Sequence, residues 1–405
     1  MREEFKDLPK EQREAVLQVA RELNQPEQPL IRKPSLNTVS MTELYEMSFA
    51  PRTPVIEGLL HCGTYIFAGS PKIGKSFFMS QVGYHVATGI PLWEYPVRQG
   101  SVLYLALEDE YSRLQSRLNQ MFGVETVDGL YLAVQSKTIG EGLGEQLSEF
   151  VQMHPDTRLI IVDTLQKVRE NGNESYSYSA DYENITALKR FSDTHNLTIL
   201  VVHHTRKMES SDSFDMISGT NGLMGAADGA VILQKKKRTT NEATMMIVGR
   251  DQPDQELKLE FNREHCIWEL TKAETKVFER PIDPLILKIS EFMRSRKVWT
   301  GSASELLAEM EITDVQPHVL TRKLNVSVSD LFNKFGIRYY QMQRSGEKRV
   351  FSMENDNYSD EPEPSDSNDA MTVNDANSKT PPLSKIASLA SQSVTEEDEE
   401  DTSNL

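Results

Sequence analysis

The sequence predicts an α/β protein with a mostly parallel β-sheet covered by helices on both faces. Short apolar runs alternate with amphipathic segments, a pattern typical of parallel strands joined by helices. Three later runs follow one another too closely for intervening helices, which predicts antiparallel strands at one edge. The parallel runs are residues 65–68, 102–107, 130–134, 159–162, 198–202 and 230–233, and the edge runs are 244–248, 257–261 and 266–270.

Composition limits the class of protein. The chain has 405 residues, 38% of them hydrophobic and 26% charged, which is ordinary for a protein with a packed core. Its longest apolar runs fall far short of the roughly 20 residues that a membrane span needs, and the N-terminus has no apolar run typical of a secretory signal. Two cysteines, Cys62 and Cys266, cannot build a disulfide framework or a zinc site. We therefore expect a cytoplasmic protein without membrane contact.

The net charge of −17 is concentrated at one end of the chain. Residues 354–405 contain 14 acidic residues and two lysines, so this tail carries most of the imbalance. Residues 280–350 contain 12 basic and 8 acidic residues. Nucleic-acid binding must therefore be considered domain by domain, because the overall charge describes mainly the tail.

Shifts in composition divide the chain into four parts. Residues 1–48 combine a helical pattern at 11–23 with a Gln-Pro-Glu-Gln-Pro stretch and are expected to form an arm or linker. Residues 49–275 form the predicted α/β domain, and residues 280–353 a second, smaller domain. Residues 354–405 are rich in Ser, Asn, Asp, Glu and Pro with almost no aromatics, so we expect a disordered tail.

A glycine-rich loop, Gly-Ser-Pro-Lys-Ile-Gly-Lys-Ser at residues 69–76, lies between the strand pattern 64–68 and the helical pattern 76–88. In this context such a loop turns backbone N–H groups toward phosphate oxygens. We expect Lys75 to reach the β- and γ-phosphates of ATP and Ser76 to ligate Mg²⁺. The expected nucleotide-binding residues are Gly69, Ser70, Pro71, Lys72, Ile73, Gly74, Lys75, Ser76 and Phe77.

Polar residues at the ends of other strands complete the expected ATPase site. Asp163 ends the apolar run 159–162 and is predicted to hold Mg²⁺, although a helix-cap role is the alternative. Glu108 follows the run 102–107 and is predicted to position the attacking water. The alternative is that Glu108 merely decorates the first turn of the next helix, together with its two acidic neighbours.

The strand pattern 197–202 ends in two histidines, His203 and His204. Consecutive side chains of a strand point to opposite faces, so at most one of them faces the nucleotide. We predict that His204 contacts the γ-phosphate, with a structural histidine as the alternative. Two histidines without a third ligand argue against a metal site.

These motifs, in this order, resemble the RecA-type ATPases, and among them the RepA-type hexameric replicative helicases of plasmids and mobile elements. The resemblance covers roughly residues 55–270, and its most specific parts are residues 55–60, 104–109 and 201–205. It implies that Lys75, Glu108, Asp163 and His204 act in ATP hydrolysis. It also implies a homo-oligomeric ring, a hexamer, that binds single-stranded DNA and works with a replication-initiation protein or primase.

The resemblance implies two further kinds of residue. Arg250 matches an arginine that reaches the ATP of a neighbouring subunit, although a surface arginine paired with Asp251 or Asp254 is the alternative. DNA-contacting loops are implied at residues 164–180 and 205–222, and solvated loops without that role are the alternative because both also contain acidic residues. Their candidate DNA contacts are Lys167, Arg169, Arg206 and Lys207.

The pattern after residue 283 resembles a winged helix. Helices are expected at 283–293, at 302–310 and as a pair within 316–335, followed by strands at 337–343 and 349–352. The stretch Ser302-Ala303-Ser304-Glu305 fits a capped helix start. The basic residues expected on one face, for contact with nucleic acid or for protein docking, are Arg322, Lys323, Arg344, Lys348 and Arg349.

The leading hypothesis is an ATP-dependent DNA helicase or translocase with ATP and Mg²⁺ as cofactors. A DNA-binding regulator or a recombination-type ATPase without unwinding activity would use the same residues. A P-loop kinase is a third reading, but no arginine-rich lid stands out in the sequence.

Overall fold

A computed structural model of the chain describes residues 38–169, 178–205, 221–235, 239–250, 252–274, 281–342 and 349–359, with the short pieces 9–11, 14, 36 and 237. Almost all of the predicted helix at 11–23 and of the predicted disordered tail lies outside these residues. Within the described residues, no helix is long and apolar enough to cross a membrane.

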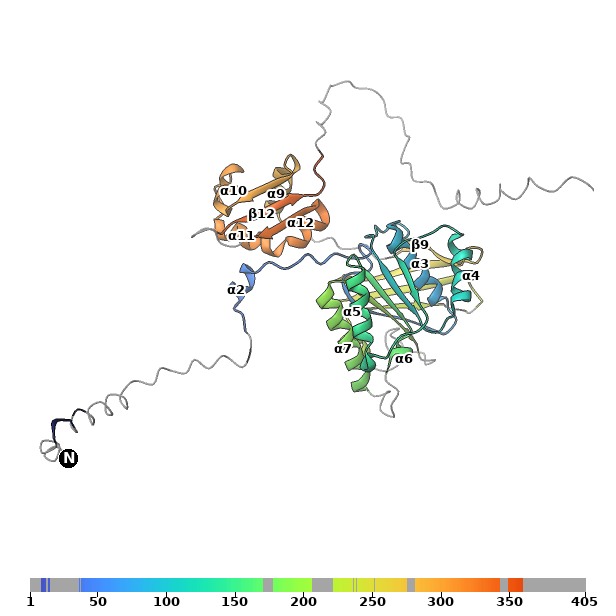
Figure 1. Cartoon of the computed structure of the whole chain (residues 1–405). Helices are drawn as coiled ribbons and strands as arrows, with labels where there is room; N and C mark the ends of the chain where they lie inside the picture. Colours follow the sequence, from blue (N-terminus) through green and yellow to red (C-terminus); the bar gives the residue numbers. More distant parts are fainter. Residues whose placement is uncertain are drawn as a thin grey trace, which may run out of the picture. The chain divides into compact units, whose positions relative to one another are not determined.

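The larger domain is built on one nine-stranded sheet with the order β3-β2-β4-β5-β1-β6-β7-β8-β9. In this order, the neighbouring strands from β3 through β2, β4, β5 and β1 to β6 pair in parallel. The strands from β6 through β7 and β8 to β9 pair antiparallel. The predicted parallel sheet with antiparallel edge strands is therefore confirmed (Figure 1). The strands are β1 (Gly63–Gly69), β2 (Val102–Ala106), β3 (Leu130–Ala133), β4 (Leu159–Asp163), β5 (Thr198–His204), β6 (Gly229–Gln234), β7 (Glu242–Gly249), β8 (Gln252–Asn262) and β9 (Ile267–Ala273).

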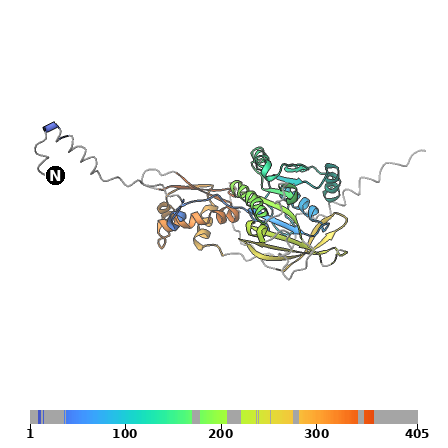
Figure 2. The same cartoon turned by 90° about the horizontal axis from the view of Figure 1, so that it is seen from below.

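Helices cover both faces of the sheet because the central strands are apolar on both sides. In β1, Tyr65 and Phe67 pack with the helix α3 on one face, whereas Ile66 and Ala68 pack with α5, α7 and α8 on the other. The two views of the cartoon agree with this layering (Figures 1 and 2). The helices are α3 (Lys75–Thr88), α4 (Tyr111–Phe122), η1 (Ile139–Glu141), α5 (Leu143–Met153), α6 (Leu165–Val168), α7 (Tyr178–His195) and α8 (Asn221–Ala226).

The carboxyl ends of four parallel strands meet at one edge of the sheet. Gly69 at the end of β1 is in register with His204 at the end of β5, and Ala106 at the end of β2 is in register with Asp163 at the end of β4. This edge is where open α/β sheets bind ligands. Strand register therefore brings together residues that the sequence separates by up to 135 positions.

The C-terminal region has a core of its own. A three-stranded sheet with the order β10-β12-β11 packs with four helices among the described residues. The helix start at Ser302 is capped as predicted, by a capping box with Glu305. The elements are α9 (Pro284–Arg294), β10 (Val298–Gly301), α10 (Ala303–Glu309), α11 (Pro317–Val326), α12 (Val328–Phe335), β11 (Ile337–Gln341) and β12 (Phe351–Asn355).

The structure differs from the expectations in two places near the domain ends. Strand β12 continues to Asn355, whose side chain donates a hydrogen bond to the carbonyl of Met293. The predicted boundary between this domain and the tail, at residue 354, therefore lies within the folded domain. In the predicted arm, residues Met41–Glu46 form a short helix, α2, that contacts α11.

Candidate nucleotide-binding site

The loop at residues 69–76 connects β1 to α3 and has a backbone that only certain residues can adopt. Gly74 has φ of +107°, and a Cβ atom added there would lie 3.2 Å from the Trp268 ring. A Cβ at Gly69 would lie 2.8 Å from the carbonyl oxygen of Leu233. Gly69 is thus required by close packing against backbone, and Gly74 by its positive φ. The loop residues Ser70, Pro71 and Lys72 are exposed, so they face the solvent from which a nucleotide would enter.

Lys75 is the buried cation of this loop, with 6% of its surface exposed. Its Nζ donates to the carbonyl oxygens of Gly69 at 2.8 Å and Ser70 at 3.1 Å, and lies 3.1 Å from Nδ1 of His204. Burial lowers the pKa of Lys75 to about 8, an effect that the carboxylates of Asp163 and Glu108 oppose. The ammonium therefore sits partly desolvated, where its attraction for an added phosphate is strong.

Asp163 ends β4 beside the start of α3. Its Oδ2 accepts hydrogen bonds from the hydroxyl of Ser76 at 2.8 Å and from the hydroxyl of Tyr104 at 3.0 Å. Burial raises the pKa of Asp163, while these two hydrogen bonds lower it. The carboxylate is thus engaged with Ser76 and Tyr104, whereas the N-cap of α6 is Thr164 and has no side-chain cap bond.

A hydroxyl and a carboxylate 2.8 Å apart at the end of the phosphate loop fit the needs of a nucleotide-bound Mg²⁺. That ion prefers oxygen ligands and usually takes one or two from the protein. Among the described residues, no cluster of three or more His, Cys, Asp or Glu side chains could hold a metal independently. The donors Ser76 and Asp163 therefore suit an ion that the nucleotide's phosphates help to hold.

The three acidic residues after β2 have different environments. Helix α4 begins at Tyr111, so Glu108 lies before the helix and not in its first turn. Its Oε1 accepts a hydrogen bond from Thr164 Oγ1 at 3.3 Å, and its charge acts on Lys75 and Asp163. Asp109 instead pairs with Arg117 at 2.7 Å and Arg113 at 3.2 Å. Glu108 is the exposed carboxylate that faces the site.

His204 lies on the other side of Lys75. Burial, together with the charge of Lys75, lowers the pKa of His204, so the neutral ring can accept the hydrogen bond from the ammonium. Its neighbour His203 is buried. Thr205 follows and places its hydroxyl 3.4 Å from that of Ser70. Of the two histidines, His204 is the one beside the phosphate loop.

An aromatic platform flanks the start of α3, and the sequence predicted only one of its members. The rings of Phe77 and Phe261 have centroids 5.7 Å apart, and the guanidinium of Arg117 lies 5.2 Å from the Phe77 centroid. Asp109 holds that guanidinium in place. Trp268 Nε1 donates to the carbonyl of Gly74 at 3.3 Å. The set comes from α3, α4, β8 and β9, and no local spacing links these segments.

Arg250 follows β7 at the opposite end of the sheet from the phosphate loop. Gly249 pairs with Gly229 at the start of β6, whereas Gly69 pairs with Leu233. Four residues of strand separate the two positions, roughly 13 Å. Arg250 is 56% exposed and lies 3.9 Å from Asp228. Among the described residues, Arg250 contacts Asp228 and the carbonyl of Gly225 and not Asp254. Asp251 lies outside the described residues, so a pairing with it stays a prediction.

The predicted DNA-contacting residues differ in their surroundings. Lys167 is exposed on α6. Arg169 is buried and pairs with Asp181 at 2.7 Å, so its guanidinium is turned inward. Arg322 and Lys323 pair with Glu46 and Asp283. The residues Arg206, Lys207, Arg344 and Lys348 lie outside the described residues.

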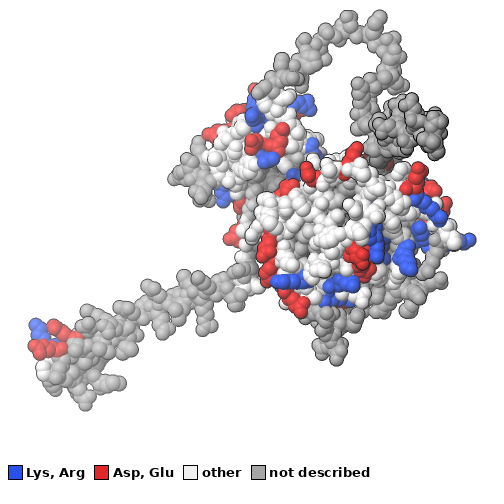
Figure 3. All heavy atoms as spheres, turned by 45° about the vertical axis from the view of Figure 1, so that its right-hand side comes forward, with Lys and Arg blue, Asp and Glu red and all other residues white. Residues whose placement is uncertain are grey.

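Surface charge alone does not single out a nucleic-acid path. On the face displayed in Figure 3, lysine and arginine side chains are interspersed with acidic ones on the described surface. Individual cations near the strand ends, such as Lys167, are therefore better candidates for phosphate contact than the surface charge as a whole. Local pairing decides whether each of them is available to a phosphate.

Comparison with known proteins agrees with the phosphate-loop assignment. Residues 31–210 match the family described as AAA domain. A comparison with curated proteins found no match. With its phosphate loop, its strand order and the AAA-domain match, the chain has a P-loop ATPase domain that resembles the RecA type.

Three solved structures are similar in fold at low identity. A structure described as an ATPase domain is 14% identical, with a TM-score of 0.45 over 64% of this chain and 98% of its own. A KaiC-like protein of the archaeon Pyrococcus horikoshii OT3 is 12% identical, with a TM-score of 0.41 over 56% and 99%. A DnaB-like replicative helicase, described with its primase interactions, is 14% identical, with a TM-score of 0.44 over 63% and 70%.

Proposed function

We propose that this chain is an ATP-dependent DNA helicase or translocase of the RepA type, which hydrolyses ATP at the subunit interfaces of a ring and moves on single-stranded DNA. The observation that carries the ATPase part is the convergence of Lys75, Asp163 and Glu108 on one edge of the sheet. These are a phosphate-binding cation, an acid beside the Ser76 hydroxyl and an exposed acid that can orient water.

Each residue has a defined task in this proposal. Lys75 exchanges its bonds to the loop carbonyls for the β- and γ-phosphates of ATP. Ser76 and Asp163 would hold Mg²⁺, which neutralises charge that develops on the phosphates. Glu108 orients the attacking water. His204, hydrogen-bonded to Lys75, changes partner when the γ-phosphate enters or leaves, and so reports the nucleotide state to the loop after β5.

The aromatic platform is suited to the base of the nucleotide. Phe77 stands directly after the magnesium-binding serine, and Arg117 and Phe261 both lie against its ring. A purine inserted against a guanidinium and an aromatic ring gains stacking and cation–π energy without base-specific hydrogen bonds. We therefore assign Arg117 and Phe261 to base binding.

The position of Arg250 supports a ring. It lies about 13 Å along the sheet from its own phosphate loop, so it cannot serve the ATP that this loop holds. Its exposed guanidinium donates to the carbonyl of Gly225 at 3.2 Å and makes a long contact of 3.9 Å to Asp228. Both partners lie at the surface, so Arg250 can exchange them for a group across an interface. In a closed ring, each Arg250 would stabilise the ATP bound by the adjacent subunit.

The DNA-binding part rests on Lys167 and on the C-terminal domain. Lys167 stands on α6, directly after the magnesium-binding end of β4, so nucleotide state and DNA position can be coupled over a short path. The order α9, β10, α10, α11, α12, β11, β12 resembles that of a winged helix with one additional helix, and in this proposal α11 is the helix that contacts DNA. A primase or replication-initiation protein is the expected protein partner.

The decisive experiment measures ATP turnover with and without single-stranded DNA, and displacement of a labelled strand from a forked duplex. We expect DNA to stimulate turnover and the strand to be displaced. Lys75→Ala should abolish both activities, while Lys137→Ala, which removes an exposed lysine outside the phosphate loop, serves as the matched control. DNA-stimulated turnover without displacement would refute the helicase and leave an ATP-dependent DNA-binding regulator.

A further inference from the structure

Helix α2 of the N-terminal arm has only six residues, but its start is fixed by a capping box. Ser40 caps it by accepting a hydrogen bond from the Glu43 amide at 3.2 Å, and the Glu43 carboxylate accepts one from the Ser40 amide at 2.7 Å. This reciprocal capping box fixes the start of the helix. The C-terminal end of α2, with Tyr45 and Glu46, is thereby presented in a defined orientation.

The C-terminal domain recognises the backbone of α2 through a buried amide. Asn325 on α11 is 5% exposed and donates to the carbonyl of Tyr45 at 2.8 Å. The Asn325 carbonyl in turn accepts from Tyr339 at 3.0 Å and from Gln341 at 2.7 Å. Gln341 also donates to the carbonyl of Glu46 at 3.3 Å. Two backbone carbonyls of α2 are thus bound by a polar network of α11 and β11.

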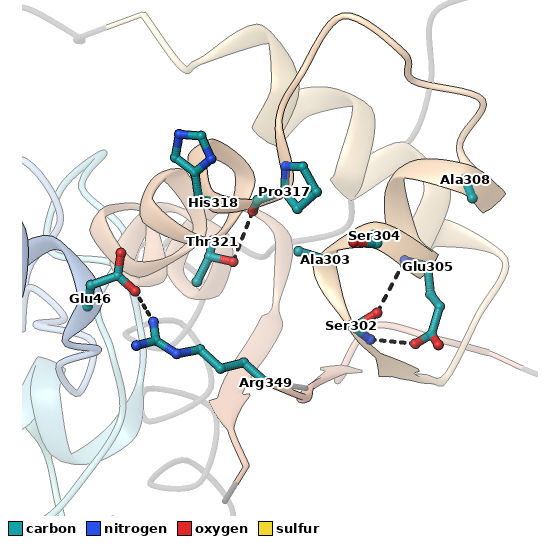
Figure 4. A pocket seen from close by; sticks show the side chains of 10 residues that line it. All are labelled: Glu46, Ser302, Ala303, Ser304, Glu305, Ala308, Pro317, His318, Thr321 and Arg349. Atoms are coloured by element: carbon teal, nitrogen blue, oxygen red, sulfur yellow. Dashed lines mark hydrogen bonds and ion pairs between the residues drawn. The ribbon is translucent and has the colours of Figure 1, made fainter. Parts of the chain in front are cut away.

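The side chain of Glu46 bridges two arginines. Its Oε1 accepts from Nε of Arg322 on α11 at 3.2 Å, and its Oε2 accepts from the guanidinium of Arg349, next to β12. Figure 4 shows Glu46 and Arg349 pointing toward each other at the rim of a groove. One carboxylate therefore neutralises two cations that come from different elements of the domain.

The groove beside this bridge is lined by polar groups next to Arg349. It encloses about 510 Å³, and its lining includes the hydroxyl of Ser304, the imidazole of His318 and the carboxylate of Glu305. The hydroxyl of Thr321 also lines it and donates to the carbonyl of Pro317 at 3.1 Å. Arg349 closes one side. Guanidinium groups bind phosphates bidentately, and hydroxyls add single hydrogen bonds. Glu46 is the carboxylate that occupies the two guanidinium groups.

We propose that Glu46 occupies a binding site for the phosphate backbone of DNA, so that α2 is a built-in competitor that covers this face of the C-terminal domain. The proposal rests on the proposed function, because it takes DNA as the ligand. Phosphate and carboxylate both present oxygens that accept from Arg322 and Arg349, so only one of them can hold the pair. Binding of DNA by these arginines therefore requires α2 to leave.

The chemistry favours nucleic acid over a protein partner as the second occupant. The apolar lining of the groove consists of Ala303, Ala308 and Pro317, which offer little surface for the aromatic or aliphatic anchors typical of protein interfaces. Arg322 lies on α11 and Arg349 next to β12, the elements that contact DNA if the domain is a winged helix, as the proposed function has it.

The test compares the affinity of the full chain and its variants for a labelled forked duplex without ATP, at several salt concentrations. Glu46→Gln keeps the shape of the side chain and removes its charge. We expect the affinity to rise about two- to tenfold, because two exposed ion pairs no longer compete. The slope of log affinity against log salt should steepen by up to about 1.8, since two further phosphates are neutralised.

Two controls separate a specific site from a general charge effect. Asp314→Asn removes one negative charge from the loop between α10 and α11 and should change affinity by less than about twofold. In the Arg322→Ala/Arg349→Ala background, Glu46→Gln should have no effect. Hydrogen exchange of residues 41–47 should increase when DNA is added to the unmodified chain, while exchange of residues 317–326 decreases.

An unchanged affinity and salt slope in Glu46→Gln would overturn the proposal, as would an equal gain from Asp314→Asn. Binding of a protein at this groove with no gain in DNA affinity would also overturn it. The helicase function is judged separately by strand displacement. If the unmodified chain displaces the strand but Glu46→Gln does not change DNA affinity, only the proposal that α2 competes with DNA is refuted. If Glu46→Gln raises DNA affinity but no strand is displaced, only the helicase function is refuted.

Discussion

Replacement of Tyr104 by Phe tests the arrangement around Asp163 most directly. The change removes one oxygen atom, whose hydrogen is donated to Asp163 Oδ2 at 3.0 Å. Tyr104 is completely buried, so water cannot easily replace the lost donor. Burial raises the pKa of Tyr104 well above its ordinary value, so the hydroxyl remains a donor over the whole working pH range.

The expected loss follows from the strength of a hydrogen bond to a charged group, about 1.5–3 kcal/mol. Asp163 is 5% exposed and would keep only the bond from Ser76 of the two that stabilise its ionised form. We expect the free energy of unfolding at pH 8 to fall by about 1.5–3 kcal/mol. Affinity for ATP with Mg²⁺ should fall as well, because a less well-held carboxylate is a poorer ligand.

The pKa shift of Asp163 sets how the stability loss in Tyr104→Phe depends on pH. Burial raises the pKa of Asp163 above its ordinary value of 3.8, so the folded protein keeps this proton to higher pH than the unfolded chain does. The free energy of unfolding therefore decreases as pH rises from 3.8 through the folded-state pKa. Loss of the Tyr104 donor raises that pKa further. The difference between variant and unmodified chain should be small near pH 4 and largest at pH 8.

Denaturant unfolding at pH 5 and pH 8 measures this difference. Tyr131→Phe is the matched control, because it removes the same atom from a ring on β3 that is 37% exposed, and it should change stability by less than about 0.5 kcal/mol. A loss at Tyr104 that is equal at both pH values, or no larger than that of the control, would refute the proposed role of the hydroxyl.

Three further predictions concern the nucleotide. Because the pKa of Lys75 is about 8, ATP affinity measured by titration should be level below pH 8 and fall by up to about tenfold per pH unit above it; a level profile to pH 9.5 would contradict a charged Lys75 as the phosphate ligand. Arg250→Ala should reduce ATP turnover about 10³-fold while ATP binding persists, and mixing it with the Lys75→Ala chain should restore part of the turnover, since each defect lies in a different subunit; no restoration would place Arg250 outside the neighbour's site. Phe261→Leu should weaken ATP binding by about 1–3 kcal/mol but leave tripolyphosphate binding unchanged, and equal losses for both ligands would argue against a base platform.

The sequence by itself predicted the class of fold and which residues meet at the candidate site. The apolar runs that became β1 to β9 were evident because strand and helix patterns are local, with periods of two and 3.6 residues. The phosphate loop was evident because its glycines, lysine and serine must be adjacent. Asp163, Glu108 and His204 were evident because each directly follows an apolar run, and parallel strands end at one edge.

Only the tertiary structure decided which side chains meet. Tyr104 lies within β2 and shows no sign in the sequence of serving Asp163, and the pairing follows from the register of β2 with β4. The platform of Phe77, Arg117 and Phe261 joins elements far apart in the chain. The burial of Arg169 against Asp181 likewise depends on where α7 packs, and it could not be read from a loop that looked solvated.

The basic residues of the C-terminal domain show the same limit most clearly. Composition predicted a basic face, but the partner of Arg322 and Arg349 is Glu46, which lies 276 and 303 residues away along the chain. A sequence shows how many cationic residues a segment contains. Whether those cations are available depends on the distances between side chains, because electrostatic attraction acts through space and is set by the folded arrangement.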